Sequence, residues 1–161
     1  MSVTDEKVEI ERKFRLFSLP EGLDNSDVTA ALIEQGYMGK LRLRRKGNQF
    51  FLNVKGKREQ SLGRGEWEVE VPGWVFAKLW PQTEGARLTK TRYGWRRDGR
   101  LLEIDVFQGH LAGLILLECE FASEAEAVSF SLPEIFGTAT EVTDDERYKN
   151  SQLARSSGIP Q

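Results

Sequence analysis

The sequence predicts an α+β protein whose main element is a closed antiparallel β-barrel. Roughly seven or eight segments alternate charged and apolar residues with a period of two, as strands with two different faces do. Short turns containing Gly, Pro, Asn or Asp separate most of these segments, so sequential strands are expected to pair antiparallel. A few short segments carry helix signals, and we expect those helices to pack outside the barrel.

The first half of the chain begins with a strand over Val8–Leu16, which ends at a turn rich in Gly and Pro. A helix or an irregular segment is expected over Ser26–Gln35. The basic strand Lys40–Lys46 then joins Gln49–Lys55 through a Gly-Asn turn, which is typical of a β-hairpin.

A polar loop rich in glycine is expected over Gly56–Gly65, followed by the strand Glu66–Val71, which a Pro-Gly pair stops. Trp74–Trp80 is predicted to be a short helix. The strands Arg87–Arg96 and Arg100–Phe107 follow, and the Asp-Gly turn between them predicts a second hairpin.

The last predicted strand is Leu114–Phe121. Ser123 and Glu126 have the spacing of a capping box, so a helix is expected to start there and to end near Phe130. A final helix is predicted over Glu146–Arg155, with acidic residues in its first turn, where the helix dipole favours them.

The length and composition predict one domain spanning residues 1–161. A chain of 161 residues with 39% hydrophobic content is long enough for one core and too short for two. The tail after about residue 156 is rich in Ser, Gly and Pro, and we expect it to be flexible.

The charge and cysteine content exclude several classes of protein. The net charge is only −2 although 30% of the residues are charged, so no general attraction to nucleic acid or to an anionic membrane is expected. The single cysteine, Cys119, excludes an intramolecular disulfide and a cysteine-rich zinc site. No apolar run has the length of a membrane span, and the expected location is the cytoplasm.

The first strand presents an unusual face, because Glu9, Glu11 and Lys13 alternate with Ile10 and Arg12. Because successive side chains of a strand point to opposite faces, Ile10 is expected in an outer apolar layer and Arg12 is expected to point away from the charged face. The same alternation recurs along the chain in five further charged pairs: Arg42/Arg44, Glu66/Glu68, Lys90/Arg92, Glu103/Asp105 and Glu118/Glu120. The charged faces are therefore predicted to line the inside of the barrel, with the hydrophobic core outside its wall.

A lumen lined by so many charges requires a charged occupant, because unpaired buried charges cost several kcal/mol each. Guanidinium and ammonium groups suit phosphate oxygens. The carboxylate pairs Glu9/Glu11 and Glu118/Glu120 suit Mg²⁺ or Mn²⁺, which would neutralise phosphate charge and orient the chain. The reaction that this set implies is hydrolysis of a linear phosphate chain.

Glu9-x-Glu11-x-Lys13 resembles the signature of the CYTH domain, the triphosphate tunnel metalloenzyme superfamily. Further blocks that look like the family's follow in order: Gln35–Tyr37, Leu41–Arg44, Leu52–Gly56, Gly65–Glu68, Leu88–Tyr93, Glu103–Phe107, Leu116–Glu120 and Glu141–Asn150. One departure is the stretch between Tyr37 and Leu41, which is shorter than the family pattern.

The resemblance implies an eight-stranded antiparallel tunnel that binds triphosphates with Mg²⁺ or Mn²⁺. On the family pattern the expected metal ligands are Glu9, Glu11, Glu118 and Glu120, which with Lys13 form the expected catalytic set. The expected phosphate ligands are Lys13, Arg42, Arg44, Lys55, Lys90 and Arg92, and the expected further acids of the wall are Glu66, Glu68 and Asp105.

The expected activity is metal-dependent hydrolysis of inorganic tripolyphosphate to pyrophosphate and phosphate, by a monomer or a homodimer. Three alternatives stay open: a class IV-type adenylate cyclase, a thiamine or nucleoside triphosphatase, and a polyphosphate-binding module without turnover. The sequence does not identify the general base.

Overall fold

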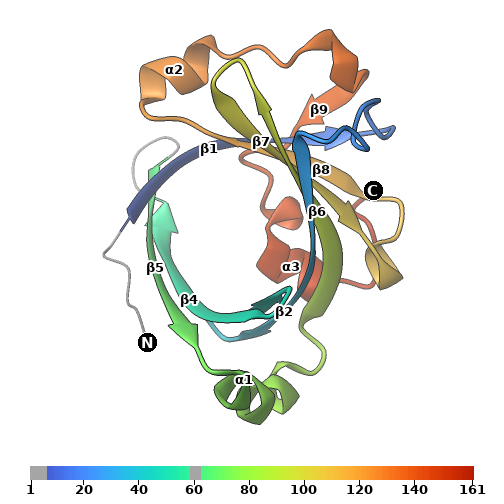
Figure 1. Cartoon of the computed structure of the whole chain (residues 1–161). Helices are drawn as coiled ribbons and strands as arrows, with labels where there is room; N and C mark the ends of the chain where they lie inside the picture. Colours follow the sequence, from blue (N-terminus) through green and yellow to red (C-terminus); the bar gives the residue numbers. More distant parts are fainter. Residues whose placement is uncertain (1–6, 59–62) are drawn as a thin grey trace.

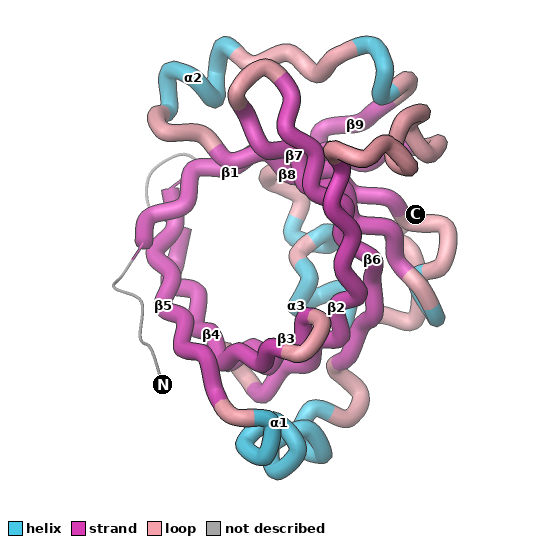
Figure 2. The backbone as a smooth tube through the Cα atoms, in the orientation of Figure 1, coloured by secondary structure: helices cyan, strands magenta, loops and turns pink. Residues whose placement is uncertain are grey.

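The computed structural model describes the backbone of residues 7–58 and 63–161, and the side chains of residues 10–54 and 67–161. Within these ranges the chain forms one nine-stranded antiparallel sheet that curves around a central space, with three short α-helices (Figures 1 and 2). None of the helices in these ranges has the length and apolar character that crossing a membrane requires.

The strands are β1 (Lys7–Leu16), β2 (Val28–Met38), β3 (Leu41–Lys46), β4 (Gln49–Arg58), β5 (Gly63–Val71), β6 (Arg87–Arg97), β7 (Arg100–Phe107), β8 (Ile115–Glu120) and β9 (Ala139–Glu141). The α-helices are α1 (Gly73–Leu79), α2 (Glu124–Ser129) and α3 (Asn150–Arg155). Four 3-10 turns complete the described elements: η1 (Trp80–Thr83), η2 (Gly109–Leu111), η3 (Glu134–Phe136) and η4 (Glu146–Tyr148).

The predicted closed eight-stranded barrel is wrong, because the structure is a nine-stranded sheet in the order β5-β4-β3-β2-β6-β7-β8-β1-β9. The partners of β1 are divided along its length. Its first residues, Lys7–Ile10, pair with the start of β5 over four residue pairs, whereas Phe14–Leu16 pair with β9. The short strand β9, which was not predicted, pairs with a different stretch of β1 from the one that pairs with β5.

The second correction concerns β2, since a helix or an irregular segment was expected over residues 26–35. The run Ala30-Ala31-Leu32-Ile33-Glu34 has good helix propensity. In the structure β2 pairs with β6 on one edge and with β3 on the other, and these two ladders of backbone hydrogen bonds override local propensity. The predicted loop over residues 56–65 is also shorter, because β4 extends to Arg58 and β5 starts at Gly63.

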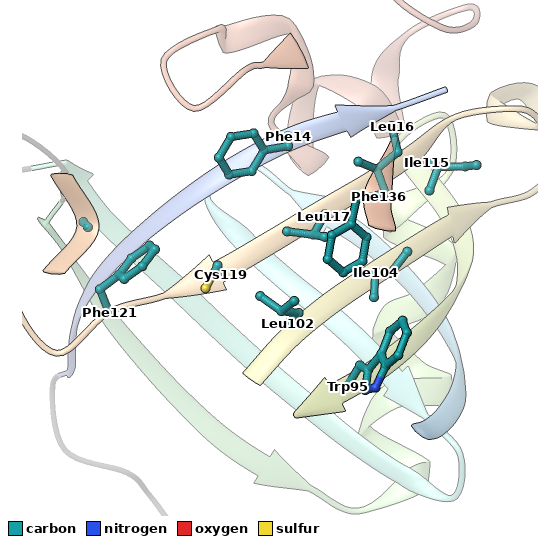
Figure 3. Close-up of a cluster of buried hydrophobic side chains, with 11 residues drawn as sticks. Phe14, Leu16, Trp95, Leu102, Ile104, Ile115, Leu117, Cys119, Phe121 and Phe136 are labelled. Carbon is teal, nitrogen blue, oxygen red and sulfur yellow. The ribbon is translucent and has the colours of Figure 1, made fainter. Parts of the chain in front are cut away.

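The larger hydrophobic cluster lies on the outer face of the sheet, as predicted. Phe14, Leu102, Ile104, Leu117 and Cys119 are buried there beneath the segment that carries α2 and η3 (Figure 3). Fully burying a side chain of this size contributes about 1.5–3 kcal/mol. Not every outward residue is covered, since the Trp67 side chain on β5 stays 44% exposed.

A second cluster forms around α3, and it corrects the expectation that all helices pack outside. Leu153 and Ala154 of α3 are buried together with Leu116 of β8. Leu116 lies on the same face of β8 as Glu118, because side chains two residues apart share a face. The α3 helix therefore packs within the curve of the sheet (Figure 1).

The predicted helix over Glu146–Arg155 is divided into η4 and α3. Lys149 between them has an extended backbone, with φ −66° and ψ 135°. This break turns the chain so that Asn150, the first residue of α3, faces the interior of the molecule.

Candidate active site

A cavity of about 860 Å³ opens on the concave side of the sheet, and we call it the central cavity. Most of its wall is charged or polar. Its lining residues are Glu11, Lys13, Tyr37, Gly39, Lys40, Arg42, Arg44, Lys46, Asn53, Val54, Glu68, Lys90, Arg92, Glu103, Glu118, Glu120, Val142, Thr143, Asp145, Lys149, Asn150, Ser151, Gln152 and Arg155.

The acidic side of the central cavity is built by β1 and β8. The antiparallel register places Glu11 opposite Glu120 and Lys13 opposite Glu118. Directly opposite residues on neighbouring strands have Cβ atoms about 5 Å apart, so these side chains form two cross-strand pairs. The strand alternation and the register of β1 and β8 therefore gather three carboxylates and one ammonium group on one stretch of wall.

Glu118 is held in its charged form by two cations. Its carboxylate lies 3.4 Å from the Lys13 ammonium and 3.7 Å from the Arg92 guanidinium. Burial alone would raise the pKa of Glu118, but the charges of Lys13 and Arg92 outweigh it and lower that pKa to about 2. Lys13 also donates a hydrogen bond of 3.2 Å to the Tyr148 carbonyl oxygen, which ties β1 to the segment before α3.

A buried ion-pair cluster on β6 and β7 continues the cavity wall beside β8. Asp105 accepts hydrogen bonds from Lys90 Nζ at 2.7 Å and from Arg92 Nε and Nη2 at 2.7 and 2.8 Å. Asp105 and Lys90 have no solvent-exposed surface. Desolvation would raise the pKa of Asp105, yet the adjacent guanidinium and ammonium groups hold it far below its usual range.

Burial has the opposite effect on Lys90, because it disfavours a positive charge. Desolvation is the largest cause and is reinforced by the charges of Arg92 and Arg44 and opposed by Asp105; together these effects lower the pKa of Lys90 to about 7. An amine that titrates near neutrality therefore forms part of the cavity wall.

The basic side of the central cavity is built by β3. Arg42 forms an ion pair of 3.3 Å with Glu68 on β5, and Asn53 donates a hydrogen bond to the same carboxylate oxygen. Arg44 donates from Nε to the Gln35 side-chain oxygen at 3.0 Å. Burial, with the nearby charges of Arg42 and Arg92, lowers the pKa of Arg44 to about 9.

The structure gathers most of the predicted site residues around the central cavity. The residues that line it are Glu11, Lys13, Arg42, Arg44, Glu68, Lys90, Arg92, Glu118 and Glu120. Asp105 differs from its expected place on the wall, since it lies behind Lys90 and Arg92 and holds them. Glu9, Lys55 and Glu66 lie outside the described side chains.

Arg12 faces the other way, as its parity predicts. Its guanidinium donates to the Glu141 carboxylate and to the backbone carbonyls of Ala127 and Phe130 on the outer layer. Arg12 therefore anchors the segment around α2 and does not line the cavity.

The sequence reasoning missed the contribution of the C-terminal segment. Asn150, Ser151, Gln152 and Arg155 of α3 line the central cavity, as does Lys149 before it. The only available signal was the family-like block that ends at Asn150, which did not show that α3 turns inward. Tyr37 also lines the cavity, and the short stretch after it is a tight hairpin turn in which Gly39 has φ +58°.

The donor set fits a divalent cation that shares its shell with substrate. Among the described side chains, no group of three or more His, Cys, Asp or Glu residues is arranged to hold a metal ion. Glu11 and Glu120 nevertheless face one another across the strand pair on the cavity wall. Mg²⁺ is commonly held by one or two carboxylates together with substrate phosphates and water, so this pair suits it.

Known proteins resemble this chain over almost all its length. An inorganic triphosphatase from Nitrosomonas europaea is 45% identical over 155 residues, which cover 92% of this chain and 97% of that protein. The chain belongs to the inorganic triphosphatase family. A second inorganic triphosphatase, from Acetivibrio thermocellus, is 33% identical over 159 residues, which cover 92% of this chain and 94% of that protein. Membership of this family confirms the resemblance to the CYTH superfamily and the prediction of a hydrolase.

Solved structures agree with the membership of the inorganic triphosphatase family. A crystal structure of an inorganic triphosphatase is 44% identical, with a TM-score of 0.69, and the match covers 95% of this chain and 97% of that one. A Hippeastrum protein studied as an adenylyl cyclase, with a dominant triphosphatase activity, is 18% identical with a TM-score of 0.55 over 74% of this chain, so it shares the fold alone. No family model matches the chain.

Proposed function

We propose that this chain hydrolyses inorganic tripolyphosphate to pyrophosphate and phosphate in the central cavity, with Mg²⁺ or Mn²⁺ as cofactor. The observation that carries the proposal is that arginine, lysine and carboxylate side chains together line one cavity. The high identity to two inorganic triphosphatases supports the same reaction.

The cations of the wall bind the phosphate chain. Arg42 and Arg44 on β3 and Arg92 on β6 present guanidinium groups, which suit the oxygens of successive phosphates. Lys13 adds a point charge beside the acidic wall. Binding at several such groups holds the linear chain in one register and draws negative charge away from the phosphorus that is attacked.

Glu11 and Glu120 are the proposed metal ligands among the described side chains, with Glu9 as a further predicted ligand. The cation supplies neutralisation of phosphate charge and orientation of the chain. Glu118 also belongs to the predicted ligand set, and in this structure it is paired with Lys13 and Arg92.

Lys90 is the best candidate for the general base. In the reaction a water oxygen bonds to the terminal phosphorus, the bridging P–O bond breaks, pyrophosphate leaves, and the water proton must be accepted. A base works best when its pKa lies near the working pH, and burial brings the pKa of Lys90 to about 7. Lys90 also lines the central cavity, where the terminal phosphate and its water would lie.

An inorganic substrate suits the wall better than an organic triphosphate. A nucleotide or thiamine group needs an aromatic or apolar platform, and Tyr37 is the sole aromatic side chain among the described lining residues. Its hydroxyl accepts a hydrogen bond from the Gln35 amide at 2.9 Å, and it belongs to the cluster around α3.

The test is a phosphate-release panel of tripolyphosphate, pyrophosphate, ATP, thiamine triphosphate and long-chain polyphosphate, each with Mg²⁺, Mn²⁺, Ca²⁺ or a chelator. We expect tripolyphosphate to be hydrolysed best, and only with Mg²⁺ or Mn²⁺. Glu11→Gln and Glu120→Gln should each lower kcat by at least about 100-fold if both carboxylates hold the cation, whereas Glu124→Gln on α2, exposed on the outer side, should match the wild type. Equal rates in all four proteins would overturn the proposal, and cyclic AMP among the products would favour the cyclase.

A further inference from the structure

Asn150, the first residue of α3, reaches the buried Lys90 side chain on β6. Its side-chain oxygen accepts a hydrogen bond from Lys90 Nζ at 2.9 Å. The helix itself is held by other residues, because Leu153 and Ala154 are buried in the cluster around α3. The amide of Asn150 is therefore not the group on which docking of the helix depends.

A chain of hydrogen bonds fixes which end of the Asn150 amide faces Lys90. Arg44 can only donate, so the Gln35 side-chain oxygen faces Arg44 Nε at 3.0 Å. The Gln35 nitrogen then points to the Tyr37 hydroxyl at 2.9 Å and toward the Asn150 oxygen at 3.5 Å. Lys90 Nζ and Gln35 Nε2 both donate toward Asn150, so the side-chain oxygen of Asn150, and not its nitrogen, must face them.

Lys90 Nζ has two hydrogen-bond acceptors among the described residues, as a neutral amine requires, and the Phe107 ring lies 5.5 Å from it. A neutral lysine has two N–H donors and one lone pair, whereas the ammonium has three donors. Asp105 Oδ2 at 2.7 Å and Asn150 Oδ1 at 2.9 Å accept two hydrogen bonds from Nζ. With both N–H groups so directed, the lone pair of the neutral amine occupies the remaining tetrahedral position of a nitrogen that is buried in the cavity wall.

We propose that Asn150 is a positioning residue, which orients the Lys90 amine so that its lone pair faces the substrate water. This inference rests on the proposed role of Lys90 as the base. The α3 helix thus contributes to turnover through one hydrogen bond to a residue of β6, and it does so without contacting the reacting atoms.

The charged groups around Lys90 decide how a change at Asn150 acts. They are Asp105 on β7, Arg92 on β6, Arg44 on β3 and Glu118 on β8, while β2 and α3 contribute the neutral amides of Gln35 and Asn150. A carboxylate in place of the Asn150 amide adds a second anion in hydrogen-bond contact with Nζ. It would hold the proton on Lys90 to a higher pH.

The experiment compares Asn150→Asp, Asn150→Ala and the wild type in tripolyphosphate hydrolysis with Mg²⁺, from acid to alkaline pH. In Asn150→Asp we expect the acid limb of the kcat profile to move up by about 1–3 pH units, with activity recovering in alkali. In Asn150→Ala we expect kcat to fall about tenfold, as one hydrogen bond of about 1.4 kcal/mol predicts, with little change in KM.

Asn48→Asp is the matched control, because it adds the same charge on the exposed turn between β3 and β4. It should keep the wild-type profile. An acid limb that stays in place in Asn150→Asp would overturn the positioning role, even if the wild type is fully active.

A second measurement separates this proposal from the proposed function. The proton of Lys90 can be titrated by NMR of lysine labelled at Cε, assigned with Lys90→Arg, without any turnover. A higher midpoint for Lys90 in Asn150→Asp supports the contact even if tripolyphosphate is not a substrate, and an unchanged midpoint refutes it. If the wild-type protein did not hydrolyse tripolyphosphate, this result would contradict the proposed function but not the contact between Asn150 and Lys90.

Discussion

Replacing Asp105 by Asn tests the electrostatics of the buried wall most directly. The carboxylate of Asp105 accepts three short hydrogen bonds, one from Lys90 and two from Arg92. Asp105→Asn keeps the shape of the side chain, removes its charge, and turns one acceptor oxygen into an NH₂ group that faces a donor. Lys90 is then left with the neutral amide of Asn150 as its other hydrogen-bond acceptor.

The expected cost follows from how completely these groups are buried. Removing one partner of a buried ion pair typically costs about 3–5 kcal/mol. We expect the lower end, about 3 kcal/mol, because Arg92 keeps Glu103 at 3.2 Å and Glu118 at 3.7 Å. For a chain of 161 residues this is a fall in Tm of about 6–12 °C.

The loss of stability should also depend on pH in a definite direction. Asp105 raises the pKa of Lys90, so without it the folded variant releases the Lys90 proton at a lower pH than the folded wild type does. In the unfolded state, both proteins keep the Lys90 proton up to the ordinary lysine pKa. In the pH range between the Lys90 pKa of the folded variant and that of the folded wild type, only the folded variant has lost this proton, so only the variant becomes more stable as pH rises. The deficit is therefore larger near about pH 5 than near about pH 8.

Urea unfolding followed by tryptophan fluorescence, at both pH values, measures the deficit. Asp98→Asn is the control, because Asp98 lies exposed in the turn between β6 and β7 with φ 52°, a conformation that asparagine tolerates. It should change the free energy of unfolding by less than about 0.5 kcal/mol. A deficit for Asp105→Asn below about 1 kcal/mol at both pH values would refute the view that Asp105 holds the two cations.

Two further predictions concern the acidic wall and the outer layer. The pKa of Glu118, about 2 in the folded protein, is below that of an unfolded glutamate, so we expect its contribution to stability above about pH 4.5 to be lost as pH falls toward 2. Urea unfolding across this range should show a smaller loss in Glu118→Gln, and equal acid sensitivity of both proteins would contradict the assignment. Arg12→Ala should lower the free energy of unfolding by about 1–3 kcal/mol through its lost hydrogen bonds to Glu141 and two carbonyls, while phosphate release per folded molecule stays unchanged. A large fall in kcat with wild-type stability would show that Arg12 contributes to the site.

The face of the sheet to which each side chain points could be predicted from the sequence, because it depends only on local chain geometry. Glu11 and Lys13, or Arg42 and Arg44, reach the same cavity because residues two apart on a strand share a face. The same rule places Arg12 on the outside, where it is found. These assignments needed no knowledge of which strands are neighbours.

The errors occur where distant parts of the chain decide the structure. The helix-favouring run in β2 becomes a strand because β3 and β6 pair with it on both edges. The sheet also contains β9, an unpredicted three-residue strand that pairs with β1. No local signal in a segment as short as Ala139–Glu141 separates a strand from a loop.

The C-terminal segment has the greatest effect on how the site is understood. The alternation of side chains along the strands accounts for the charges on the cavity wall. It does not account for the protonation state of Lys90, because this state depends on which groups cover the side chain. Asn150 from α3, together with Asp105 from β7, surrounds Nζ, and burial then lowers the pKa of Lys90 to about 7. A lysine on a solvated strand face would keep its ordinary pKa and remain a phosphate ligand. The inward turn of α3 therefore helps to cover the cation that we propose as the base.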